Sequence, residues 1–221
     1  MKDNKLFSQE MSKLFDIGDQ IRESLSDKTR TRDDVLTRSR QLIRLCANTI
    51  RAIHRNNLDE ITLLLEEATS CAADLRQCAG RNTDLYFAGY TQDALKEFVE
   101  VNVLYAIVCR LDIPSHIDLQ VEPATYLKGL SEAATELRRT ILDIIRTDHL
   151  DEAERLLEAL DEIYNLLITM DFPDAITAGL RRNTDILRSV RERTRGDLTM
   201  SIRHQRLEKV LERIGKLQGK S

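Results

Sequence analysis

The segment 93–108 constrains the fold more than any other part of the chain, because it predicts a helix that is apolar on almost every side. From Phe98 to Val108 nearly every residue is apolar. A helix with this pattern belongs at the centre of a bundle, since a helix at the surface keeps a polar face. Two carboxylates near its start, Glu97 and Glu100, interrupt the apolar pattern, and their three-residue spacing places both on one helix face.

These two carboxylates allow two interpretations. Removing two like charges from water is costly unless a cation or a proton compensates them. Either Glu97 and Glu100 lie where the helix emerges into water, or a positive group sits between them. Buried carboxylates are almost always paired, so the residues alone leave both interpretations open.

Composition predicts an all-α protein without a membrane segment. The 221 residues include eight Gly and three Pro, and 32% of them are charged, which favours helices. No apolar run reaches the ~18–20 residues that cross a bilayer. The N-terminus lacks the apolar core of a signal peptide, so we expect a cytoplasmic protein. The cysteines form no C-x-x-C pair, which argues against zinc.

Helical periodicity and helix breakers predict a single helical domain over residues 1–221. We expect a break between the first two helices at residues 26–31, where Thr31 can begin a cap. Pro114 and Pro123 bracket a loop with no helical pattern. Gly196 is expected to interrupt the C-terminal helix. The predicted helices cover about 4–26, 32–56, 58–79, 91–111, 123–146 and 149–169, followed by a C-terminal helical segment.

Charge is segregated along the chain. The net charge of −4 by itself argues against nucleic-acid binding. However, residues 179–221 hold twelve Lys or Arg against five acidic residues, and residues 143–162 hold eight acidic residues against two Arg. A basic end with an acidic middle suits a protein that holds a polyanion in one place and a metal in another. It also suits an ordinary solvated helix surface.

Carboxylates are the groups best able to carry chemistry in this sequence. It has no phosphate-binding glycine motif, no nucleophile in a recognisable setting and no Glu-x-x-His pair for a di-iron bundle. Asp148 and Glu152 form a second acidic pair at a predicted helix start. Four carboxylates from two helices suit a hard cation such as Mg²⁺ or Mn²⁺. Such an ion can promote hydrolysis of a phosphodiester, which basic helices would also attract.

Three segments of the chain resemble the translin and TRAX family. Residues 121–139 read VEPATYLKGLSEAATELRR, which is similar to the family stretch V-x-P-x-x-Y-L-x-G-[LV]-x-x-x-x-x-E-L-x-R. Residues 95–101 read LKEFVEV, which is similar to the family's L-Q-E-Y-V-E-A. Ser39-Arg40 and His54-Arg55 are similar to parts of the family's second helix. The matches follow in order over most of the chain.

This resemblance implies a seven-helix bundle subunit that assembles into hollow octamers and binds single-stranded or structured RNA. For the acid-bearing TRAX branch, it also implies a metal-dependent RNA endonuclease. The family's first catalytic pair matches Glu97 and Glu100, and its second pair falls most simply on Asp148 and Glu152. Phe98 stands where the family usually has Tyr.

The resulting primary prediction is an endoribonuclease that depends on Mg²⁺ or Mn²⁺ and works as a homo-oligomer. It requires the carboxyl groups of Glu97 and Glu100 to meet the second acidic pair in space. Asp151 and Glu154 are the alternative register for that second pair. The alternative functions are a non-catalytic protein that binds single-stranded RNA or DNA, and a purely structural oligomer. The residues expected to contact RNA are Arg40, Arg44, His54 and Arg55.

Overall fold

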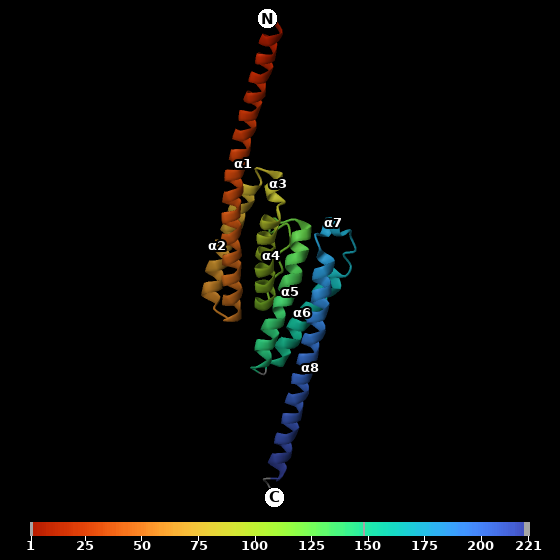
Figure 1. The fold of residues 1–221 in the computed structure, drawn as a ribbon. Helices are drawn as coiled ribbons and strands as arrows, with labels where there is room; N and C mark the ends of the chain where they lie inside the picture. Colours follow the sequence, from red (N-terminus) through yellow and green to blue (C-terminus); the bar gives the residue numbers. More distant parts are fainter. Residues whose placement is uncertain (1, 148, 219–221) are drawn as a thin grey trace.

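Helices make up almost all of the computed structural model, which describes residues 2–147 and 149–218 (Figure 1). The prediction of an all-α bundle is confirmed. Two helices of four residues each, α3 (Thr83–Tyr86) and α7 (Asp174–Thr177), accompany the long ones. The long helices are α1 (Lys2–His54), α2 (Leu58–Ala79), α4 (Gly89–Cys109), α5 (Pro123–Ile145), α6 (Leu150–Leu167) and α8 (Leu180–Gln218).

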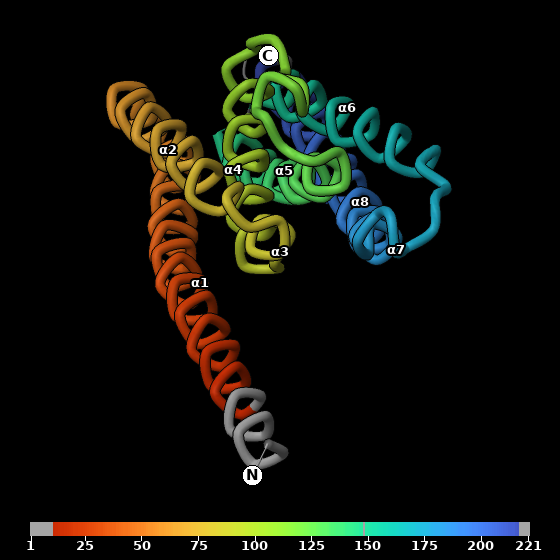
Figure 2. The backbone as a smooth tube through the Cα atoms, turned by 90° about the horizontal axis from the view of Figure 1, so that it is seen from above, coloured from red at the N-terminus to blue at the C-terminus, as the bar shows by residue number. Residues whose placement is uncertain are grey.

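The apolar helix α4 lies at the centre of the bundle, as its sequence predicts. It contacts α1, α2, α3, α5 and α6, and Leu95, Val99 and Val103 along its length are fully buried. In Figure 2, α1 and α2 lie to one side of α4, while α5, α6 and α8 lie to the other. Burial of such side chains contributes ~1.5–3 kcal/mol each, so α4 holds the two sides of the bundle together.

α1 continues without a break through residues 26–31, which corrects the prediction of two separate helices. The hydroxyl groups of Ser26, Thr29 and Thr31 each donate a hydrogen bond to the backbone carbonyl four residues earlier. These side chains are therefore satisfied inside one helix instead of capping a second one. Likewise, Gly196 lies inside a continuous α8, because one glycine costs a helix only about 1 kcal/mol.

The first part of α1 and the last part of α8 project beyond the bundle in opposite directions (Figure 1). Both projecting parts expose large apolar side chains. A run of exposed apolar residues on one soluble helix usually marks an interaction surface. None of the described helices is both long and apolar enough to span a bilayer. The exposed apolar residues of these parts are Met11, Leu14, Phe15, Ile17, Ile21 and Leu25 on α1, and Met200, Leu207, Val210, Leu211 and Ile214 on α8.

Candidate metal centre

Three carboxylates meet between α4 and α5. Glu97 and Glu100 come from α4 and Glu132 comes from α5, and one carboxylate oxygen of each lies within 4.8 Å of the others. Within the described residues, no other three His, Cys, Asp or Glu side chains converge in this way. The structure therefore brings the predicted pair together with a third acid on a second helix.

A close approach of α4 and α5 explains why Glu132 reaches the other two acids. At Gly129, a Cβ atom would lie 2.7 Å from the backbone carbonyl oxygen of Lys96. Real Cβ atoms essentially never come so close to another atom, so only glycine allows this contact. Glu132 follows three residues later on nearly the same face of α5. The absence of a Cβ atom at Gly129 therefore sets the distance between the acids of α4 and α5.

Lys96 supplies the positive charge that contacts this cluster directly. Its Nζ atom lies 2.5 Å from Oε2 of Glu132 and 3.2 Å from Oε1 of Glu97. Burial acts to lower the pKa of Lys96, but the hydrogen bonds and negative charges of Glu132 and Glu97 outweigh it and raise the pKa overall. The lysine therefore sits between the two acids as an ammonium group.

Glu100 is the buried member of the cluster. Its residue exposure is only 8%. Burial, reinforced by the negative charges of Glu97, Glu132 and Glu136, raises the pKa of Glu100 to about 8. Burial, together with the negative charges of Glu97 and Glu100, also raises the pKa of the Cys46 thiol on α1. That thiol is therefore protonated, and the groups available to a cation here are carboxylate oxygens.

His54 and Glu136 form a partly buried pair beside the cluster. The Nε2 atom of His54 lies 2.5 Å from Oε1 of Glu136, and the His54 side chain is only 5% exposed. Glu136 follows Glu132 by four residues on α5, so both project from one helix face. The contact of His54 with RNA stays a prediction, because this pairing does not test it. In the structure His54 pairs with a carboxylate that adjoins the metal-binding candidates.

The chain is similar to known proteins in both sequence and structure. The chain is 33% identical over 192 residues to an uncharacterized protein, MJ0175, of Methanocaldococcus jannaschii, a match that spans 86% of this chain and 85% of that protein. The crystal structure of AfC3PO is similar with a TM-score of 0.76 and 29% identity, covering 83% of this chain and 95% of that chain. The chain belongs to the translin family. No family model matches the sequence.

Two further structures support the translin-family fold. A complex of AfC3PO with duplex RNA matches with a TM-score of 0.72 and 29% identity, again over 83% of this chain and 95% of that chain. Apo-NeC3PO matches with a TM-score of 0.76 over 83% of this chain and 96% of that chain. Its identity of 20% shows the fold alone.

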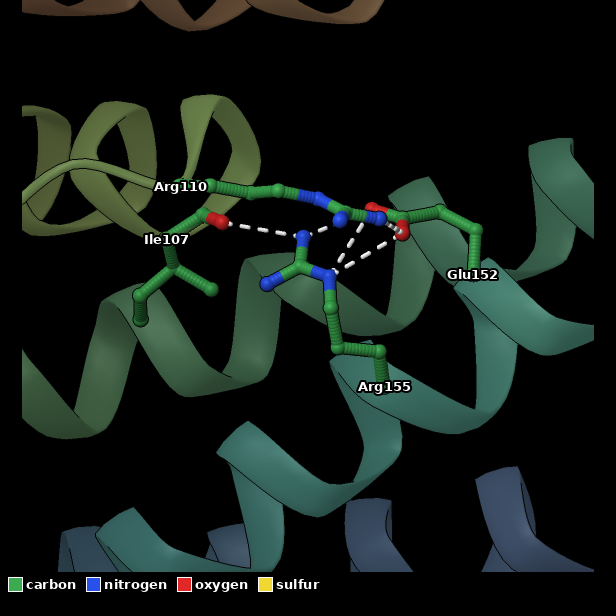
Figure 3. Close-up of polar contacts among 4 residues, drawn as sticks. All are labelled: Ile107, Arg110, Glu152 and Arg155. Atoms are coloured by element: carbon green, nitrogen blue, oxygen red, sulfur yellow. Dashed lines mark hydrogen bonds and ion pairs between the residues drawn. The ribbon is translucent and has the colours of Figure 1, made fainter.

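Glu152 lies in a different part of this translin-family bundle, which corrects its predicted place beside Glu97 and Glu100. Its carboxylate accepts hydrogen bonds from Arg155 at 2.6 Å and from Arg110 at 2.5 Å (Figure 3). The Arg155 hydrogen bond is the main reason that the pKa of Glu152 is lowered.

Arg155 fixes this position, because it also donates to the backbone carbonyl of Ile107 at 3.0 Å. Ile107 lies near the C-terminal end of α4, roughly 10–15 Å along the helix axis from the two α4 acids. Glu152 is therefore a structural ion-pair residue at that end. Asp148 lies outside the described residues. In the alternative register, Asp151 and Glu154 are exposed on α6 and do not join the cluster.

The sequence contains a signal for Glu132 that the search for acidic runs missed. Glu132 and Glu136 lie inside the translin-family stretch 121–139 and have the four-residue spacing expected of the second pair. They also occupy α5, the long helix that follows α4 directly. The run at 143–162 holds more carboxylates, so acidic composition alone favours that segment for the second pair.

The other predicted RNA contacts lie on exposed parts of α1. Arg40 and Arg44 are exposed, and neither forms an ion pair within the described part of the chain. Arg55 is exposed too, but its guanidinium donates to both carboxylate oxygens of Glu60 at 2.9 Å. Arg40 and Arg44 are therefore better placed than Arg55 to meet an anionic ligand.

Proposed function

We propose that this chain is a metal-dependent endoribonuclease of the acid-bearing TRAX type, in which Glu97, Glu100 and Glu132 hold Mg²⁺ or Mn²⁺. The observation that carries the proposal is the convergence of these acids from two helices within 4.8 Å. Carboxylate oxygens are the ligands that such hard cations prefer. Glu132 takes the role that the sequence assigned to Asp148 and Glu152.

The exposure of the cluster suits a site that must admit both an ion and a substrate. The side chains of Glu97 and Glu132 are 27% and 32% exposed, while Glu100 lies beneath them. A divalent cation here would supply the charge stabilisation and the activated water that phosphodiester hydrolysis needs. Glu100 must release its proton to become a ligand, and His54 holds Glu136 in place at the edge of the site.

RNA is the substrate class that fits best. AfC3PO has been solved as a complex with duplex RNA, and it shares 29% of its residues with this chain over most of both lengths. The exposed Arg40 and Arg44 supply positive charge for a phosphate backbone. We expect binding of single-stranded or structured RNA, with single-stranded DNA as a further candidate.

A cleavage assay with labelled single-stranded RNA tests the proposal. The wild-type chain should cut the RNA with Mg²⁺ or Mn²⁺ and stop when EDTA is added. A Glu97→Gln/Glu100→Gln double variant should bind RNA but lose cleavage, because two ligands of the ion are gone. Circular dichroism should show unchanged helicity. Full activity in the double variant would refute the proposed centre.

The second candidate function is RNA binding without cleavage. One observation favours it: the Lys96 ammonium already contacts two of the three acids, so the cluster is partly neutralised without a metal. Under this alternative, RNA binding falls steeply with salt and EDTA-sensitive cleavage is absent. A purely structural protein would show no salt-dependent RNA binding.

We also propose that the chain forms a homo-oligomer, with the family's octamer as the expected state. The projecting parts of α1 and α8 present apolar side chains outside the bundle. A second copy of the chain would bury these side chains against its own apolar surface.

A further inference from the structure

The candidate metal centre contains a cation that belongs to the protein itself. The Lys96 ammonium bridges the two helices that build the centre, because it contacts Glu97 on α4 and Glu132 on α5. Its side chain is only 14% exposed. This lysine is therefore held between the acids and does not extend freely into water.

A divalent ion and the ammonium compete for these carboxylates. Mg²⁺ binds carboxylate oxygens at about 2.0–2.1 Å, and Nζ already approaches the same two side chains at 2.5 and 3.2 Å. Two cations placed so closely also repel each other strongly in a partly buried site. Binding of an ion to Glu97 and Glu132 therefore favours displacement of the lysine.

We infer that Lys96 is an internal counter-ion that occupies the cation position between Glu97 and Glu132 and competes with the divalent metal for them. Without metal, it offsets the repulsion among the half-buried acids and stabilises the contact between α4 and α5. With metal, it moves away from both carboxylates. This inference rests on the proposed metal centre and assigns a regulating residue to it.

Glu100 supports this inference through its position. One of its carboxylate oxygens lies within 4.8 Å of oxygens of both Glu97 and Glu132, but the ion pairs of Lys96 are with the latter two. One ammonium thus faces three acids, whereas a divalent ion would bring twice its charge to the same cluster. The lysine therefore lowers metal affinity without removing the demand for a cation.

Calorimetric titration of the full chain with Mn²⁺ alone, in the absence of RNA, tests the inference. Lys96→Gln removes the charge and introduces the residue that the translin-family motif carries at this position. We expect the variant to bind Mn²⁺ at least about tenfold more tightly than wild type. In EDTA its Tm should fall below that of wild type, and Mn²⁺ should raise its Tm by more.

Lys28→Gln is the matched control. Lys28 forms a single ion pair of 2.5 Å with Asp84, outside the cluster, so the variant loses the same charge and one comparable contact. Its Mn²⁺ affinity should equal that of wild type. This comparison separates competition at the centre from a general effect of net charge.

Unchanged or weaker Mn²⁺ binding by Lys96→Gln would overturn the inference while leaving the metal centre intact. Absence of Mn²⁺ binding in both wild type and variant would overturn the centre itself, and the inference with it. If Lys96→Gln does not fold, acylation of wild-type lysines followed by mass spectrometry gives the answer. Mn²⁺ should then increase the labelling of Lys96 but not of Lys28, and equal Lys96 labelling with and without bound Mn²⁺ would contradict displacement.

Discussion

Gly129 of α5 lies so close to Val99 of α4 that a Cβ atom at residue 129 would come 2.6 Å from the Val99 Cβ. This contact occurs one turn before Glu132 on α5 and between the two acids of α4. The separation of the carboxylates is therefore set by backbone packing, and each residue of the contact contributes to the geometry of the centre.

Replacing Gly129 with Ala should push α5 away from α4. We expect a loss of about 1–3 kcal/mol in the free energy of unfolding, as for other overpacked sites, and weaker Mn²⁺ binding because Glu132 moves. Urea unfolding and Mn²⁺ titration measure the two effects. Gly196→Ala is the control: nothing lies within 4 Å of its Cβ position, so it should be neutral or stabilise α8 by up to about 1 kcal/mol. Wild-type stability in Gly129→Ala would contradict this account of the contact.

Glu132→Gln and Glu152→Gln should separate the metal centre from the ion-pair site. Glu132→Gln removes one proposed ligand, so we expect Mn²⁺ affinity to fall at least about tenfold and RNA cleavage to be lost. Glu152→Gln should keep wild-type Mn²⁺ affinity and RNA cleavage. It should lose only about 1 kcal/mol in the free energy of unfolding, because the ion pairs of Glu152 with Arg110 and Arg155 are partly exposed. If only the Glu152 variant lost Mn²⁺ binding, the metal-binding residues would lie at the start of α6 and not between α4 and α5.

The buried Glu100 predicts how stability without metal depends on pH. Its pKa is raised from 4.5 to about 8, so the folded chain keeps a proton that the unfolded chain releases. The stability that protonated Glu100 contributes to the folded chain is present in full below about pH 4.5 and is lost as the pH rises towards 8. Tm measured in EDTA between pH 5 and 8 should therefore decline less in Glu100→Gln than in wild type. Parallel Tm curves for the two proteins would show that Glu100 does not titrate in this window.

The exposed arginines of α1 and the buried His54 should differ in their effect on RNA binding. An Arg40→Ala/Arg44→Ala variant should bind RNA more weakly and reduce the slope of log affinity against log salt by roughly two, one for each lost phosphate contact. His54→Gln should leave the slope unchanged, because its side chain faces Glu136. Filter binding at several salt concentrations gives both slopes. A reduced slope in His54→Gln would instead support the prediction that His54 contacts RNA.

The projecting part of α1 should carry subunit contacts. Leu14 and Leu58 are almost equally exposed, at 58% and 57%, but only Leu14 lies on the projecting apolar face. Leu14→Asp should reduce the mass measured by light scattering, because a charge would have to be buried between copies. Leu58→Asp should keep the wild-type mass. The proposal fails if wild type is already monomeric.

The local features of this protein could be read from its sequence. The apolar run after Phe98 predicted the buried helix α4, because such a helix has no face suited to water. The three-residue spacing predicted that Glu97 and Glu100 share a face, since helix periodicity alone determines it. The break expected at residues 26–31 was wrong because hydroxyl side chains can either cap a helix or bond within it, and the residue types do not distinguish the two.

Only the tertiary structure decided which acids meet. Glu132 and Glu152 are alike as sequence features, each an acid on a helix that follows α4. Gly129 lets α5 pack against the acid-bearing part of α4, whereas Arg155 ties Glu152 to the other end of that helix. The pairing of His54 with Glu136 could not be predicted from the sequence either, because the two residues are 82 positions apart. Sequence spacing determines which side chains share a helix face, but packing between helices determines which faces touch.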